Sequence, residues 1–227
     1  MSIDIEVLTD RLTETILGQV RGNLAAHGWF QVEASGRHVH LSTDDAKVIF
    51  GDDYYLVWKK YLSQPGQFVC EQRVTLVGPK GRLENVVIIG PERKETQIEV
   101  SMTDAVTLGI TPPCRDSGNL DDTPSIRIEN GDTWVETHGG MIVAERHIHV
   151  RPDAAAALGI TDGQRVDFDL DSSRPLTFRD VKVRVSAAAD NFMHIDYDEA
   201  NAAGFTKGIF GTISARGYQR KEDLYGH

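Results

Sequence analysis

One short motif, a pair of histidines separated by an apolar residue, occurs twice and constrains the fold more than any other feature of the chain. The two copies are residues 37–41 (RHVHL) and residues 146–150 (RHIHV). Each copy is followed by a stretch that contains aspartate and alanine, and then by a glycine, Gly51 or Gly159. Because about half the chain separates the copies, they indicate a duplicated unit of domain size and not a solenoid of short repeats.

The apolar neighbours of the histidines predict that each motif is a β-strand. Residues two apart in a strand face the same side, so both imidazoles of a pair converge while Val39 or Ile148 faces a core. Two neutral imidazoles on one face suit zinc, which also needs a third protein ligand. For a single pair, solvated histidines are an equal alternative. The duplication favours metal sites.

Two further stretches repeat the pattern without the second histidine, at residues 97–109 and 193–204, and they contribute Glu99 and His194. The candidate ligand lies ten residues before the closing glycine in three of the four copies, and eleven residues before it in the first copy. Each copy predicts a strand, a helix N-cap, a short helix and a glycine just after the helix. Four strand-to-helix junctions therefore offer His and Glu side chains from equivalent places.

Composition excludes several classes of function. The chain has 227 residues and a formal net charge of −10, which disfavours general binding to nucleic acids or anionic membranes. No apolar run is long enough to span a bilayer, and an acidic N-terminus does not resemble a signal peptide. Cys70 and Cys114 lack a Cys-x-x-Cys spacing, so we expect free thiols in a reducing cytoplasm.

Residues 4–27 form the clearest amphipathic helix, with an apolar stripe that begins at Ile5 and continues at every fourth position from Leu8 to Leu24. We expect this face to pack on its own domain. The alternative interpretation is a helix that docks into a groove of a partner protein.

The rest of the chain predicts mostly β structure. Residues 68–77 and 83–89 are apolar or alternating runs joined by a turn signal at residues 78–81, and residues 165–170 and 181–185 repeat this rhythm. Many short strands suggest small barrels. We expect a loop at residues 111–124 and a polar tail at residues 214–227.

Arg93 is the basic residue of greatest interest, because it lies six residues before Glu99. A guanidinium group can hold a phosphate through two hydrogen bonds. A single arginine in a loop is usually a surface residue, so the case for Arg93 as a phosphate-binding residue depends on the candidate metal ligands near it.

Seven sequence blocks together resemble the propanediol-utilisation type phosphotransacylases, also called phosphate propanoyltransferases. The resemblance covers about residues 31–210 and keeps the family's block order. The blocks are RHVHLS, LSQPGQF, EQRVTLVGPKG, GPERKETQIEVS, SGNL, VAERHIHVRP and MHIDYDEANAAG.

The resemblance implies a site with two zinc ions. His38, His40 and Glu99 match the ligands of one zinc, whose open position can take the sulfur of coenzyme A or phosphate. The ligands of the second zinc, completed by water or phosphate, match His147, His149 and His194, and Arg93 matches the residue that binds the attacking phosphate.

The resemblance also implies a mainly β fold with short helices, in which two small β-barrels with helical caps hold the dimetal site between them. We place the N-terminal helix in residues 1–27 and the first barrel in residues 28–37 plus 145–213. The second barrel is then residues 38–144, followed by the polar tail, residues 214–227.

The implied reaction converts a short-chain acyl-CoA, acetyl or propionyl, and phosphate into acyl phosphate and CoA. Zinc would polarise the thioester and stabilise the leaving thiolate, so phosphate can attack directly without a protein nucleophile. Two alternatives remain open at this point. One is a zinc-dependent thioesterase, which would use metal-bound hydroxide, and the other is a non-catalytic structural zinc or docking protein.

The CoA-binding residues are not apparent from the sequence. The candidates for its phosphates are Arg73, Lys80, Arg82, Lys94 and Arg115. The resemblance further implies a homo-oligomer that is cytoplasmic or packaged in a bacterial microcompartment, where the N-terminal helix would bind a shell or core protein. We expect neither nucleic acid nor membrane as a partner.

Overall fold

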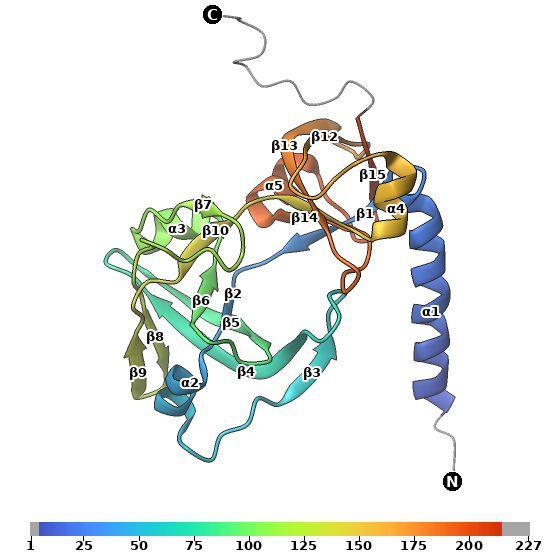
Figure 1. The fold of residues 1–227 in the computed structure, drawn as a ribbon. Helices are drawn as coiled ribbons and strands as arrows, with labels where there is room; N and C mark the ends of the chain where they lie inside the picture. Colours follow the sequence, from blue (N-terminus) through green and yellow to red (C-terminus); the bar gives the residue numbers. More distant parts are fainter. Residues whose placement is uncertain (1–4, 215–227) are drawn as a thin grey trace, which may run out of the picture. The chain divides into compact units, whose positions relative to one another are not determined.

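The computed structural model describes residues 5–214, and in these residues the chain is mainly β with five helices. The described chain divides into two compact units (Figure 1). Unit 1 contains residues 5–34, 146–195 and 200–214, whereas unit 2 contains residues 35–145 and 196–199. Each unit therefore has its own core, and we describe them separately.

Unit 1 is built on a closed six-stranded barrel with the strand order β1-β14-β11-β13-β12-β15. The antiparallel pairing of β1 with β15 closes it. Its core includes Phe30, Ile148 and Phe168, which are fully buried. The strands are β1 (Trp29–Ser35), β11 (His147–Val150), β12 (Arg165–Leu170), β13 (Leu176–Val185), β14 (Phe192–Asp196) and β15 (Phe210–Ile213), and the helices are α1 (Ile5–Ala25), α4 (Pro152–Leu158) and α5 (Tyr197–Ala203). The last residues of β1 and β14 and the first three residues of α5 fall in unit 2.

Unit 2 is built on a nine-stranded sheet with the order β7-β10-β6-β2-β5-β4-β8-β9, and β3 pairs with β4 beside this path. Its core includes Val39, Ile98 and Leu108. Our prediction of a second closed barrel is therefore not confirmed by the described strands. The strands are β2 (His38–His40), β3 (Trp58–Tyr61), β4 (Phe68–Val77), β5 (Arg82–Gly90), β6 (Gln97–Glu99), β7 (Cys114–Arg115), β8 (Arg127–Asn130), β9 (Thr133–Glu136) and β10 (Met141–Ala144), and the helices are α2 (Thr43–Phe50) and α3 (Met102–Leu108).

All four predicted strand-to-helix junctions are present, at β2–α2, β6–α3, β11–α4 and β14–α5. The side chains of Ser42 and Ser101 accept hydrogen bonds from backbone N–H groups in the first turn of their helices, and Pro152 begins α4. Gly109 and Gly159 end their helices in the left-handed conformation that glycine tolerates best. Local sequence signals thus determine where each ligand-bearing strand stops.

The N-terminal helix differs from our expectation. Leu12, Ile16 and Val20 lie on the predicted apolar face, yet each is about half exposed, at 55, 58 and 49 %. The expectation that this face packs on its own domain is wrong for these residues, whereas Ala25 at the C-terminal end of α1 is fully buried. No helix in the described part of the chain is long and apolar enough to cross a membrane.

Two other predictions need correction or lie outside the structure. The predicted loop at residues 111–124 contains the short strand β7, which pairs in parallel with β10 at Val143 and Ala144. The two strands are far apart in the sequence, so the sequence alone did not predict this pairing. The predicted polar tail lies outside the described residues apart from Ser214. In the described part of the chain neither Cys70, which is buried, nor Cys114, which is exposed, forms a disulfide.

Candidate metal centres

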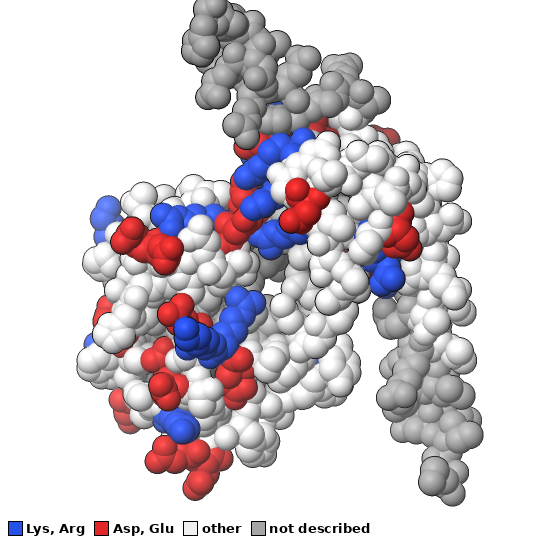
Figure 2. Space-filling view, in the orientation of Figure 1, with Lys and Arg blue, Asp and Glu red and all other residues white. Residues whose placement is uncertain are grey.

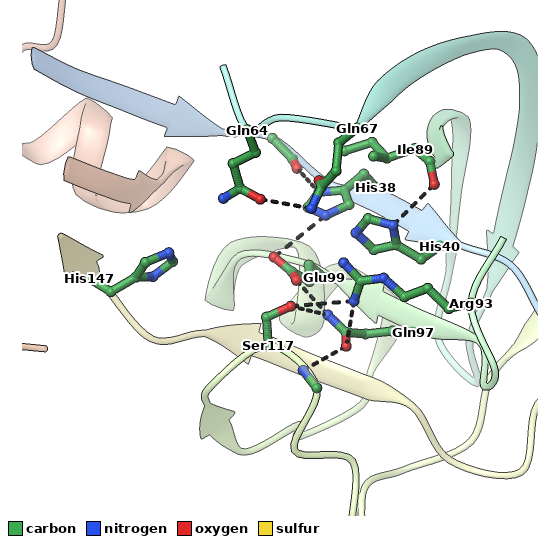
Figure 3. A network of polar contacts seen from close by, with 12 residues as sticks. His38, His40, Gln64, Gln67, Ile89, Arg93, Gln97, Glu99, Ser117 and His147 are labelled. Carbon is green, nitrogen blue, oxygen red and sulfur yellow. Dashed lines mark hydrogen bonds and ion pairs between the residues drawn. The ribbon is translucent and has the colours of Figure 1, made fainter. Parts of the chain in front are cut away.

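In unit 2, the ligand atoms of His38, His40 and Glu99 all lie within 4.8 Å of one another. The two histidines come from β2 and the glutamate from the neighbouring antiparallel strand β6, where Glu99 lies directly opposite His38. Val39, between the histidines, is fully buried in the core, as its position in the motif predicts. All three candidate ligands are buried, and Glu99 Oε2 lies 3.5 Å from His38 Nε2 (Figure 3).

Backbone carbonyl groups orient both imidazoles. His38 Nδ1 lies 2.9 Å from the Gly36 oxygen, and His40 Nδ1 lies 3.0 Å from the Ile89 oxygen. Because a carbonyl oxygen only accepts, each Nδ1 must carry a hydrogen, and each Nε2 is therefore directed away from the backbone and towards the candidate metal position. Burial, reinforced by the charges of His38 and Arg93, lowers the pKa of His40 to about 2. A neutral imidazole of this kind, together with a carboxylate, fits zinc.

The loop that carries Arg93 is attached to the β2–α2 junction. The Arg93 N–H group donates to the Leu41 oxygen at 2.9 Å, and the Ser42 N–H group donates to Thr96 Oγ1 at 2.8 Å. Thr96 in turn donates to the Asp45 carboxylate. These contacts place the half-buried guanidinium group beside the three candidate ligands, where Figure 3 shows it next to His40 and Glu99.

Unit 1 repeats this strand arrangement with three histidines. His147 and His149 come from β11, and His194 lies directly opposite His147 on the antiparallel strand β14. The three ring centroids are 4.7 to 5.2 Å apart, and the Nε2 atoms of His147 and His149 are separated by 3.1 Å. Ile148, between the first two, is fully buried.

The electrostatics of this second group also suit a cation. His194 Nε2 is buried and has no hydrogen-bond partner among the described residues. Burial is the main cause that lowers the pKa of His194 well below its ordinary value, and burial with Arg184 lowers the pKa of His149 to about 4. The lowered pKa values of His149 and His194 favour neutral imidazoles, and the buried His194 Nε2 without a partner is the kind of donor that a metal ion would satisfy.

Two residues of the unit 2 site were missed by sequence reasoning. Gln97 and Ser117 join Arg93 and Glu99 in one hydrogen-bonded network. Gln97 could have been found, because it lies two residues before Glu99 on a strand and so faces the same side. Ser117 begins the SGNL block, but it lies twenty residues away along the chain, so the sequence did not show that it contacts Gln97.

Three of the five candidates for CoA phosphates already have partners within unit 2. Arg73 donates to backbone oxygens of Glu71 and Gln72, Arg82 pairs with Glu129, and Arg115 donates to Asn119. Lys80 and Lys94 lie on exposed positions near turns. Positive and negative side chains are interspersed on the face shown in Figure 2.

The chain is similar to known proteins over most of its length. A family model described as phosphate propanoyltransferase matches residues 31–206. A phosphate propanoyltransferase of Enterococcus faecalis is 53% identical over 184 residues, which are 81% of this chain and 87% of the relative. One from Clostridioides difficile is 46% identical over 209 residues, 92% of this chain and 98% of the relative. Another, from Thermotoga maritima, is 47% identical over 178 residues, 78% and 85% of the two chains.

Proposed function

Because the chain belongs to the phosphate propanoyltransferase family, whose members are acyltransferases, we propose that it exchanges acyl groups between coenzyme A and phosphate. The proposed substrates are a short-chain acyl-CoA, acetyl or propionyl, and inorganic phosphate, and the products are acyl phosphate and CoA. The observation that carries the proposal is the buried group of His38, His40 and Glu99 with Arg93 beside it.

We propose that phosphate attacks the thioester carbonyl directly. A phosphate oxygen forms the new bond to the carbonyl carbon, the C–S bond breaks, and CoA leaves as a thiolate. When bound, zinc would act as a Lewis acid that polarises the carbonyl and stabilises the thiolate. The proposed ligand sets are His38, His40 and Glu99 for one ion and His147, His149 and His194 for the other.

The residues of this chain supply position and charge. Arg93 carries a permanent positive charge and two N–H groups that match two phosphate oxygens. Its backbone contact to Leu41 holds the loop against β2, so the guanidinium group need not be ordered when phosphate binds. The carbonyl groups of Gly36 and Ile89 keep the Nε2 atoms of His38 and His40 directed away from the backbone.

The first experiment measures release of the CoA thiol from acetyl-CoA and propionyl-CoA, with and without phosphate, while acyl phosphate is trapped as a hydroxamate. We expect thiol release that requires phosphate, yields matching hydroxamate, stops on chelation and returns with Zn²⁺. Thiol release that ignores phosphate would instead identify a thioesterase, and no release from zinc-loaded protein would favour a structural or docking role. Acyl-enzyme formation with ping-pong kinetics would refute direct attack.

Two substitutions at Arg93 test its proposed role. Arg93→Met should raise the KM for phosphate roughly 10- to 150-fold, because a charged hydrogen bond is worth about 1.5–3 kcal/mol. Arg93→Lys keeps the charge but loses the planar pair of donors, so its KM should lie between wild type and Arg93→Met. An unchanged phosphate KM in both variants would remove Arg93 from the mechanism. Lys94→Met, on the adjacent exposed position, serves as the control for phosphate and tests the CoA contact.

We further propose that α1 binds a shell or core protein of a bacterial microcompartment through the apolar face that Leu12, Ile16 and Val20 leave exposed. Changing these three residues to serine should abolish co-localisation with shell proteins while acyltransferase activity is kept. Serine at Thr13, Gln19 and Asn23 is the matched control on the polar positions. The homo-oligomeric state is also a proposal, which sedimentation of the full chain would test.

A further inference from the structure

The side-chain amide of Gln97, in unit 2, makes four hydrogen bonds. Gln97 is 1% exposed and lies on β6, two residues before Glu99. Its amide nitrogen donates to Glu99 Oε1 at 2.5 Å and to Ser117 Oγ at 2.8 Å. Its amide oxygen accepts from Arg93 Nη1 at 3.1 Å and from the Gly118 N–H group at 2.8 Å. Figure 3 shows these contacts converging on one side chain.

These partners allow only one orientation of the amide. The nitrogen side meets a carboxylate and a hydroxyl oxygen, whereas the oxygen side meets a guanidinium group and a backbone N–H group. Rotating the amide by 180° would place its oxygen against the Glu99 carboxylate and its N–H groups against the donors of Arg93 and Gly118. Both hydrogens and both lone pairs of the amide are used, so the group has no capacity left for another partner.

We propose that Gln97 is a positioning residue that holds the carboxylate of Glu99 and the guanidinium group of Arg93 in one fixed relation. The inference deepens the proposed function and rests on it for the roles of Glu99 as a zinc ligand and Arg93 as the phosphate-binding residue. One amide fixes one oxygen of Glu99, which leaves Oε2, the atom nearest His38, to face the metal position. Gln97 and Ser117 both accept from Nη1 of Arg93, which leaves the donors on Nη2 and Nε for an anion.

The energetic reason for this arrangement is the burial of opposite charges. Burial lowers the pKa of Arg93, and the negative charge of Glu99 acts in the opposite direction. Without an intervening group, the guanidinium and the carboxylate would favour a direct ion pair, and each would then be engaged by the other instead of by its ligand. An amide satisfies both charges and carries none itself. It therefore separates the two groups while it fixes their directions.

The test compares Gln97→Met with wild type in three measurements. Methionine has nearly the same length but makes none of the four hydrogen bonds. We expect a phosphate KM at least about 10-fold higher and an acyl-CoA KM changed by less than about 2-fold. In a competition with a chromophoric chelator, zinc affinity should fall about 10- to 100-fold, as for other residues that orient metal ligands. Ser117→Ala removes one partner of both Gln97 and Arg93, and it should shift phosphate KM and zinc affinity in the same directions by about 2- to 5-fold.

Gln72→Met is the matched control. Gln72 also bridges two partners with its amide, the Val57 N–H group and the Tyr55 oxygen, but it belongs to no part of the site. Its substitution should lower thermal stability while phosphate KM and zinc affinity stay unchanged. If Gln97→Met behaves like this control, or if its phosphate KM and zinc affinity stay within 2-fold of wild type, the positioning role is wrong.

The outcomes separate this inference from the proposed function. If Arg93→Met raises the phosphate KM but Gln97→Met and Ser117→Ala do not, the proposed function stands and only the positioning role falls. If turnover of wild type is independent of phosphate, both fall. Should Gln97→Met fail to fold, Ser117→Ala decides the matter, because it removes a hydroxyl group at the edge of the network.

Discussion

Zinc-free protein should lose stability when the pH falls from 7 to 5, and His40 alone should account for about 2 kcal/mol of that loss. Burial lowers the pKa of His40 from 6.5 to about 2 in the folded state. The unfolded chain therefore takes up a proton near pH 6.5, whereas the folded chain does not. Because the unfolded state binds more protons, the free energy of unfolding decreases as the pH falls, beginning near 6.5 and continuing towards 2.

The magnitude at pH 5 does not depend on the exact folded pKa. At that pH the buried imidazole is neutral whether its pKa is 2 or 3, so the loss follows from protonation of the unfolded chain alone. A group with an unfolded pKa of 6.5 contributes about 0.2 kcal/mol at pH 7 and about 2 kcal/mol at pH 5, and the difference is the expected effect.

The assay is urea unfolding of chelated protein at both pH values, for wild type and His40→Gln. Glutamine does not titrate, so the variant should lose about 2 kcal/mol less than wild type between pH 7 and pH 5. Comparing the change with pH within each protein removes the baseline cost of the substitution. His27→Gln is the control, because His27 is exposed at the end of α1. If wild type and His40→Gln lose the same free energy within about 0.5 kcal/mol, the assignment of a buried neutral His40 is refuted.

Three further predictions test other parts of the structure. Gly140→Ala should lower the free energy of unfolding by at least about 3 kcal/mol, because the new Cβ would lie 2.2 Å from the Thr96 oxygen at a backbone φ of +96°. Gly131→Ala is the control, because Gly131 has a φ of +59° and open space around it, and it should lower the free energy by about 1 kcal/mol in the same thermal unfolding assay. Arg21→Met breaks the ion pair with Asp190 at 2.9 Å and should accelerate hydrogen exchange in α1, and unchanged exchange would contradict this anchoring role. Zinc at 100 times its dissociation constant should stabilise the unit that binds it by about 2.7 kcal/mol per site, and a melting temperature unaffected by chelation would exclude both sites.

Local structure could be predicted from the sequence because its causes are local. The alternation of histidine with Val39 or Ile148 determines which side chains share a face, and serine, proline and glycine mark the ends of the helices that follow. Strands β4 and β12 begin and end at the residues we predicted. These features depend on neighbours within one turn or one strand.

The remaining contacts could not be predicted because they join residues distant in sequence. Nothing in residues 97–99 says that β6 lies beside β2, yet this pairing alone brings Glu99 opposite His38. The exposure of Leu12 and Ile16 was missed for a related reason, because an apolar stripe shows that a face avoids water but not what covers it. The network around Gln97 also depends on Ser117, which lies beyond the following helix.

The uneven spacing of the first copy shows how the repeated design tolerates an extra residue. His40 lies eleven residues before Gly51, whereas the equivalent spacing is ten in the other copies. An extra residue between His38 and His40 would turn one of the two histidines to the opposite face of the sheet. The structure places the extra residue in the helix instead: α2 has eight residues, whereas α3, α4 and α5 each have seven. Gly51 then leaves the helix with φ of 92° and ψ of 167° instead of the left-handed geometry of Gly109 and Gly159. The end of α2 therefore accommodates the extra residue, and the side chains of β2 keep the alternation that places both histidines on one face.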